Sequence, residues 1–276
     1  MSRHWIDLPG LGLFVFLLSG APLHAQDVFV GKKSTPASEQ TPLGQVDHTP
    51  WAELLQKYVN EEGLVDYRGW KASAEDSAKL DAYLNALSAG DTSAPASAAD
   101  KIAFWSNAYN AVTVRGILRE YPTDSIRNHT AKLWGYNIWK NLKLYVGGEP
   151  INLDSMEHQV LRPLGDHRIH FAIVCASIGC PRLLNDAYVV ERLDEQLDAN
   201  ARHFFAQQRN FRVDRSSNRV YLSSILSWFA EDFGGGDQEV LRTISRYVDD
   251  EPTRALLTSG KARVSHLDYD WGINEQ

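Results

Sequence analysis

The stretch between residues 99 and 120 constrains the fold most, because its apolar residues recur at the spacing of a helix that is buried on several sides. These residues are Ile102, Trp105, Ala108, Tyr109, Val112 and Ile117. Pro122 ends the helix, since the residue before a proline disfavours helical geometry. Asn107 and Asn110 are three positions apart and share a face. We expect a central buried helix whose two amides bind neighbouring loops; the alternative is that Asn107 orients a catalytic imidazole.

Helical spacing predicts shorter helices on both sides of this one. They cover residues 51–59, 75–87, 154–162, 193–207, 226–233 and 240–247. At the start of the third of these, Asp154 and Glu157 have the spacing of a capping box, and Pro163 ends the helix.

Strand signals are fewer and shorter. Alternation predicts hairpins over residues 134–147, with a turn at Gly147-Gly148, and over 211–222, around Asn218. Buried and alternating strands are expected at residues 169–174 and 264–271. Together with the helices, they predict a single α+β domain, a helix-rich body on a small, mostly antiparallel sheet. A papain-like or transglutaminase-like arrangement is one form that such a domain can take.

The N-terminal residues predict export. Residues 1–25 combine Arg3, a short apolar core and a small-residue end, which is the pattern of a signal peptide. We therefore expect a periplasmic or secreted protein with no stable membrane span after cleavage. Residues 26–50 are polar and predict a flexible leader before a domain at 51–276. The net charge of -7 argues against nucleic acid as a partner.

The two cysteines of the chain, Cys175 and Cys180, follow the predicted strand at 169–174. Pro181 at the first position of a helical turn would make Cys180 its N-cap, where free N–H groups favour a thiolate. In an oxidising compartment the two thiols could instead form a structural disulfide. A bridge over so short a loop could also be easily reduced, which leaves a redox role open.

Several polar residues are candidates for a site. Asp154, His158 and Arg162 follow one another at intervals of four, so one helix face carries a carboxylate, an imidazole and a guanidinium. This row could support acid–base chemistry or form a surface ladder of charges, and Glu157 points elsewhere. His170 opens the predicted strand, either as a hydrogen-bonded core residue or as a catalyst. The spacing of the histidines does not favour a metal site, and no cofactor motif is present.

Taken together, several segments resemble the domain of unknown function 547. They are the sequences at 104–110 (FWSNAYN), 153–162 (LDSMEHQVLR), 170–175 (HFAIVC), 179–181 (GCP) and 267–271 (LDYDW). The resemblance spans Trp51 to Asn274. It implies that one site contains the residues at the family's motif positions, which are Asn107, Asn110, Glu157, His158, Arg162 and His170.

Three functions fit these residues. The leading specific interpretation is a cysteine-dependent hydrolase or acyl transferase acting on peptide-type substrates, with Cys180 as nucleophile, His158 or His170 as base and Asn107 as orienter. Asn110, Asp154, Glu157, Arg162 and Cys175 would support this site. The second is a non-catalytic module that binds a peptide, a glycan or another cell-envelope ligand, with structural cysteines. The third is thiol–disulfide exchange through Cys175 and Cys180.

Overall fold

The computed structural model describes residues 27–131 and 136–276, and within them it is a helix-rich α+β fold. The α-helices are α1 (Thr49–Tyr58), α2 (Tyr67–Ala72), α3 (Ala74–Ser88), α4 (Ala98–Glu120), α5 (Ile138–Asn141), α6 (Leu153–Ser155), α7 (Leu193–Ala206), α8 (Ile225–Trp228), α9 (Asp237–Ile244) and α10 (Glu251–Thr258). The strands are β1 (Val28–Val30), β2 (Thr41–Pro42), β3 (Gly90–Asp91), β4 (Leu142–Val146), β5 (Glu149–Asn152), β6 (Phe211–Asp214), β7 (Arg219–Ser223) and β8 (Arg263–Leu267). The predicted α+β class is confirmed.

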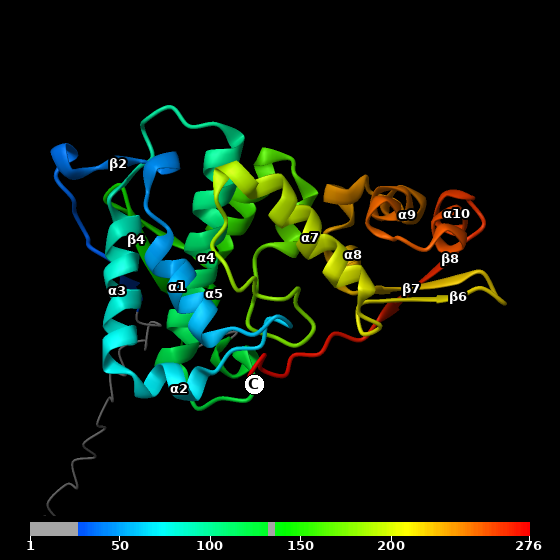
Figure 1. The fold of residues 1–276 in the computed structure, drawn as a ribbon, viewed down its shortest axis with the longest axis horizontal. Helices are drawn as coiled ribbons and strands as arrows, with labels where there is room; N and C mark the ends of the chain where they lie inside the picture. The colour runs from blue at the N-terminus through cyan, green and yellow to red at the C-terminus, as the bar shows by residue number, and fades with distance from the viewer. Residues whose placement is uncertain (1–26, 132–135) are drawn as a thin grey trace, which may run out of the picture.

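Helix α4 is the central element, as its apolar pattern predicts. It begins with a capping box, in which the Ser97 hydroxyl accepts from the Asp100 N–H and the Asp100 carboxylate accepts from the Ser97 N–H. It ends at Glu120, just before Pro122. Helices α1, α2 and α3 cover one side of α4, and α9 and α10 lie at the far end of the molecule (Figure 1). The predicted helices at 51–59, 75–87 and 193–207 correspond to α1, α3 and α7.

The strands form three small sheets rather than one. Their orders are β1-β4-β5, β2-β3 and β6-β7-β8. The β4–β5 and β6–β7 pairs are antiparallel hairpins, with turns at Gly147-Gly148 and around Asn218 as predicted. The first hairpin is formed by residues 142–152, not 134–147, and residues 132–135 lie outside the described part of the chain. The other three pairings of the described strands are parallel, so the sheets are not mostly antiparallel.

Residues 27–50 contain regular structure where we expected a flexible leader. Strand β1 pairs in parallel with β4, with Val28 opposite Leu142, and β2 pairs with β3. Leu43 is buried in the core. Polar composition suggested a leader, whereas short strands that pair with distant parts of the chain leave no local pattern. The predicted signal peptide, residues 1–25, lies outside the described residues.

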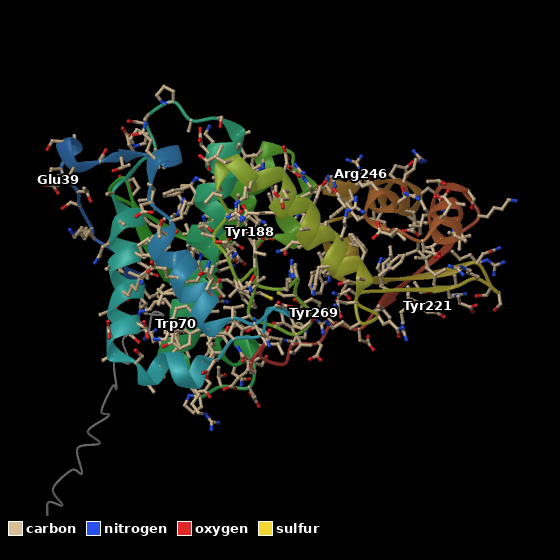
Figure 2. The ribbon with its side chains drawn as sticks, viewed as in Figure 1. Glu39, Trp70, Tyr188, Tyr221, Arg246 and Tyr269 are labelled. Carbon is tan, nitrogen blue, oxygen red and sulfur yellow. The ribbon has the colours of Figure 1, made fainter. Side chains whose placement is uncertain are left out.

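The core has two apolar clusters, and the C-terminal segment connects them. One cluster surrounds α4, and the other lies among α7, α9 and the β6-β7-β8 sheet. After β8 the chain runs back toward α1 and α2 (Figure 1). Tyr269, on this returning segment, packs against both clusters and lies between the helical body and the C-terminal part (Figure 2). None of the helices described is both long enough and apolar enough to cross a bilayer.

Candidate functional site

The segment before the cysteines is not a strand. His170 lies in a short 3-10 helix, His167–Phe171, and the residues after it pair with no strand. Their backbone groups are bound by a side chain instead, because Asn110 donates to the Ala172 carbonyl and accepts from the Val174 N–H, both at 2.9 Å. The prediction of a strand at 169–174 is therefore wrong, since an amide on α4 takes the place of a neighbouring strand.

Cys180 is not a helix N-cap, because no helical turn follows Pro181. The loop between the cysteines pairs instead with the C-terminal segment: the Ile178 and Gly179 N–H groups donate to the Gly272 and Asp270 carbonyls, at 2.8 and 2.9 Å. Gly179 permits this approach, since a Cβ atom there would lie 3.0 Å from backbone atoms of Asp270. Ala176 adopts a left-handed conformation (φ 59°), which is uncommon for a residue other than glycine.

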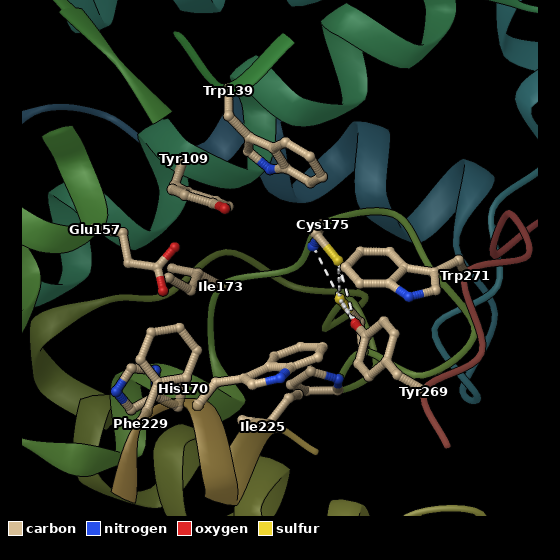
Figure 3. Close-up of a pocket in the computed structure, with 13 residues that line it drawn as sticks. Tyr109, Trp139, Glu157, His170, Ile173, Cys175, Ile225, Phe229, Tyr269 and Trp271 are labelled. Atoms are coloured by element: carbon tan, nitrogen blue, oxygen red, sulfur yellow. Dashed lines mark hydrogen bonds between the residues drawn. The ribbon is translucent and has the colours of Figure 1, made fainter. Parts of the chain in front are cut away.

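The two thiols face one another. Their Sγ atoms are 2.6 Å apart, against about 2.05 Å in a disulfide bond, and both cysteines are free. The Cys175 N–H donates to Cys180 Sγ at 3.0 Å. The Tyr269 hydroxyl lies 3.0 Å from Cys180 Sγ and 3.2 Å from Cys175 Sγ (Figure 3). A disulfide can form here after only a small movement.

The two cysteines differ in exposure and in acidity. Cys175 is half-buried, whereas Cys180 is only 5% exposed. Hydrogen bonding with Cys180, helped by hydrogen bonds with Ser177 and Tyr269, outweighs burial and lowers the pKa of Cys175 from 9.0 to about 7. Burial raises the pKa of Cys180 above its ordinary value. The more acidic and accessible thiol is thus Cys175, which reverses the roles expected from the sequence.

Both cysteines line a cavity of about 160 Å³ whose walls are largely aromatic (Figure 3). The lining residues outside the cysteine loop come from α4, α5, the segment 157–173, α8 and its flank, and the C-terminal segment. The aromatic ones are Tyr109, Trp139, Trp228, Phe229, Tyr269 and Trp271. Trp228 is 50% exposed and packs against Tyr269 and Trp271.

Glu157 reaches the same cavity, because the helix that carries it is not a regular α-helix. After α6 the chain forms a π-helix, Met156–Leu161, and the N-cap is Asn152, which accepts from the Ser155 N–H; Asp154 is not the cap. The predicted capping box is therefore wrong, whereas Glu157 does point away from Asp154 and His158, into the cavity. Burial, followed by the charge of Cys175, raises the pKa of Glu157 from 4.5 to about 7. Wide π-turns recur at functional sites.

Asp154, His158 and Arg162, which were predicted to share one face of this helix, do not stay together in the structure. His158 and Asp154 remain neighbours on the surface, with His158 Nε2 3.9 Å from Asp154 Oδ1, and neither lines the cavity. Arg162 turns to Asp232 and holds its carboxylate with two hydrogen bonds, of 2.7 and 3.0 Å. His158 is therefore not placed to act as a base for either thiol.

His170 lines the cavity but is held by its own partners. Its Nε2 lies 2.7 Å from Asp232 Oδ2, and its ring stacks on Phe229 with centroids 4.2 Å apart. Burial lowers the pKa of His170 from 6.5 to about 4, although Asp232 acts in the opposite direction. His170 and Glu157 lie on one side of the cavity, and Cys175, Tyr269 and Trp271 lie on the other (Figure 3).

Asn107 binds a neighbouring loop, as expected from the sequence. Its side chain donates to the Tyr188 carbonyl at 2.8 Å and accepts from the Tyr188 N–H at 3.0 Å. The amide is fully buried and does not line the cavity, so it orients no imidazole there. Asn107 and Asn110 thus fasten two irregular segments to α4, and the second of these segments carries Cys175.

Of the predicted site residues, the structure brings Glu157, His170, Cys175 and Cys180 to one cavity, with Asn110 and Arg162 behind it. It leaves Asn107, Asp154 and His158 outside. Sequence reasoning missed Tyr269 and Asp232. Tyr269 lies in a segment quoted for the family resemblance but taken only as a final strand. No sequence pattern pointed to Asp232.

The hydrogen bond between the two thiols predicts how the alkylation rate of Cys175 depends on pH. With iodoacetamide labelling followed by peptide mass spectrometry, Cys175 should react with a midpoint near pH 7 in the reduced protein. In a Cys180→Ala variant the midpoint should rise by about one unit or more, because the largest cause of the low pKa is removed. An unchanged midpoint would mean that Tyr269 and Ser177 set the acidity of Cys175 without Cys180.

The fold and site together define an α+β protein with a dithiol at the wall of an aromatic cavity. Residues 94–205 match the family model described as "Protein of unknown function, DUF547". This range contains α4, the π-helix and the cysteine loop, but not Asp232, Tyr269 or Trp271. No curated protein and no solved structure matches the chain.

Proposed function

We propose that this protein catalyses thiol–disulfide exchange, with Cys175 as the attacking thiol and Cys180 as the resolving thiol. The observation that carries the proposal is the pairing of a half-buried thiol of lowered pKa with a buried thiol of raised pKa, at an Sγ–Sγ distance of 2.6 Å. The attacking group in such exchange is a thiolate, and a pKa close to the ambient pH gives the best attacking thiol.

The exchange proceeds in two steps. The Cys175 thiolate attacks one sulfur of a substrate disulfide, a mixed disulfide forms, and the departing thiolate takes up a proton. Cys180 then loses its proton and attacks Cys175 Sγ, which forms the Cys175–Cys180 bond and releases the second substrate thiolate to be protonated. Two electrons pass from the protein dithiol to the substrate, which leaves as two thiols.

The surroundings of the thiols favour exchange over hydrolysis. A cysteine hydrolase needs a base beside its sulfur, and no histidine of the described residues hydrogen-bonds either Sγ atom. His170 is bound to Asp232, and its lowered pKa makes it a weak base. Export to the periplasm or beyond the cell, predicted from residues 1–25, fits a role in disulfide chemistry.

Mass spectrometry with a neutral disulfide tests the proposal. When the reduced protein is treated with excess hydroxyethyl disulfide, the wild type should lose two hydrogen atoms and carry no adduct. Cys180→Ser should accumulate one mixed disulfide at Cys175, because no resolving thiol remains. Cys175→Ser is the matched control and should react slowly, since Cys180 is buried.

Two results would overturn this assignment. One is a wild type that stays a dithiol in excess disulfide. The other is an adduct that forms as fast in Cys175→Ser as in Cys180→Ser. The predicted peptide or cell-envelope ligand stays a prediction.

A further inference from the structure

The cavity beside the thiols contains, among aromatic rings, a carboxyl group that forms no salt bridge within the described residues. Glu157 is the one acidic residue in its lining, and none of the salt bridges among residues 27–131 and 136–276 includes Glu157. Its side chain points into the cavity from the side opposite Cys175 (Figure 3). A carboxylate in an apolar cavity is poorly solvated, so a positively charged ligand would stabilise it.

The nearby positive charges fill this role only in part: the Arg162 charge acts to lower the pKa of Glu157, but burial outweighs it. The Arg162 guanidinium lies over Phe229, 5.3 Å from the ring centroid, but is already paired with Asp232. Arg127 lies over Trp271 at 5.2 Å and is exposed, where salt screens its charge. Glu157 and Cys175 each have a pKa of about 7 and belong to none of the salt bridges among the described residues, and both become negative when they lose a proton.

Aromatic rings are the second feature that suits a cation. The faces of tryptophan, tyrosine and phenylalanine attract ammonium groups, and the attraction is strongest where water is excluded. Six aromatic residues line the cavity. Its volume of about 160 Å³ is close to that of cavities of about 150 Å³ that hold benzene, so one small substituted ammonium group fits.

We propose that this cavity binds a substituted ammonium group between Glu157 and the aromatic walls, and that the protein's disulfide substrates carry such a cation near the reacting sulfur. The second part rests on the proposed exchange chemistry, and the first does not. A substrate whose sulfur meets Cys175 would direct its cation toward Glu157 on the opposite side (Figure 3).

Binding of an unreactive cation tests the first part. Choline and dimethylbutanol have nearly the same shape, and only choline is charged. Titrated into the reduced protein and followed by tryptophan fluorescence, choline should bind about tenfold more tightly or better, which corresponds to about 1.4 kcal/mol. Glu157→Gln should bring the two affinities within about threefold of each other. Asp154→Asn, which removes a carboxylate outside the cavity, should keep the difference. Equal affinities in the wild type would overturn the cation site.

Three disulfides of similar size test the second part: cystamine is cationic, hydroxyethyl disulfide is neutral and dithiodiglycolate is anionic. Each rate of oxidation of the protein is divided by the rate with a small free thiol, which removes intrinsic reactivity. The normalised rates should fall in the order given, and Glu157→Gln should lower the ratio of cystamine to hydroxyethyl disulfide by about tenfold.

The outcomes separate the two proposals. A higher normalised rate with dithiodiglycolate than with cystamine would overturn the inference. It would mean that the positive charge of Arg127, and not the carboxylate of Glu157, determines which substrates enter the cavity. If none of the three disulfides reacts, the exchange function fails together with the substrate class, whereas the choline titration still decides whether the cavity is a cation site.

Discussion

Replacing Glu157 by glutamine is expected to stabilise the folded protein by about 2–3 kcal/mol at about pH 8, relative to its effect at about pH 4.5. Burial raises the pKa of this carboxyl from 4.5 to about 7. Between these values the folded state keeps a proton that the unfolded state has released, so the group's contribution to stability falls as pH rises through this window. Glutamine does not titrate, so residue 157 no longer lowers the free energy of unfolding of the variant as pH rises.

The measurement must be a difference between variants, because other groups act in the opposite direction. Burial lowers the pKa of both His48 and His170 from 6.5 to about 4, so their contribution to stability rises with pH between these values. Urea unfolding of wild type and Glu157→Gln under reducing conditions, at several pH values, cancels these shared contributions. A difference between wild type and Glu157→Gln that stays constant with pH would contradict a buried carboxyl that resists ionisation.

Replacing Asn110 by alanine is expected to lower the free energy of unfolding by about 3–5 kcal/mol. The substitution leaves the Ala172 carbonyl and the Val174 N–H unpaired in the core, where each lost partner costs about 1–3 kcal/mol, and it also leaves a cavity. Asn107→Ala is a matched control, because it also removes two hydrogen bonds, both to Tyr188. Urea unfolding measures both costs.

The two asparagine variants should differ at the thiols. Asn110 holds the segment that leads into Cys175, so Asn110→Ala should change the rate and the pH midpoint of Cys175 alkylation, whereas Asn107→Ala should leave both close to wild type. Asn110→Gln keeps an amide that can donate to Ala172 and accept from Val174, and is the second variant if the alanine form does not fold. Equal changes in Cys175 reactivity in Asn107→Ala and Asn110→Ala would contradict this specific hold.

The sequence predicted the parts of the fold that depend on local periodicity. Apolar spacing located α1, α3, α4 and α7, and glycine and asparagine located the two hairpin turns. The sequence did not predict the parts of the fold that depend on contacts between residues far apart in the chain. The apolar run at 169–174 looks like a strand until the Asn110 amide takes its backbone bonds, and β1 exists only because β4 lies beside it.

The site was predicted in part for the same reason. The types and order of residues indicated that the cysteines, Glu157 and His170 belong to a site. They did not indicate which of these side chains lie next to one another. A π-turn, invisible in the apolar pattern, directs Glu157 inward, and the acidity of Cys175 depends partly on Tyr269, 94 positions later in the chain. Fixed helical intervals placed Asp154, His158 and Arg162 in a row, whereas the pairing of Arg162 with Asp232 turns its guanidinium away.

The surroundings of the thiols are complete only when the returning segment after β8 has packed in place. Tyr269 and the backbone partners of the cysteine loop lie beyond residue 263, and Asn274 and Gln276 are fastened to Val65 near the other end of the described chain. We expect contacts between such distant segments to form late, since closing a long loop costs entropy before any contact is gained. If they do, the alkylation rate of Cys175 during refolding should reach its native value only after the helices around α4 have formed.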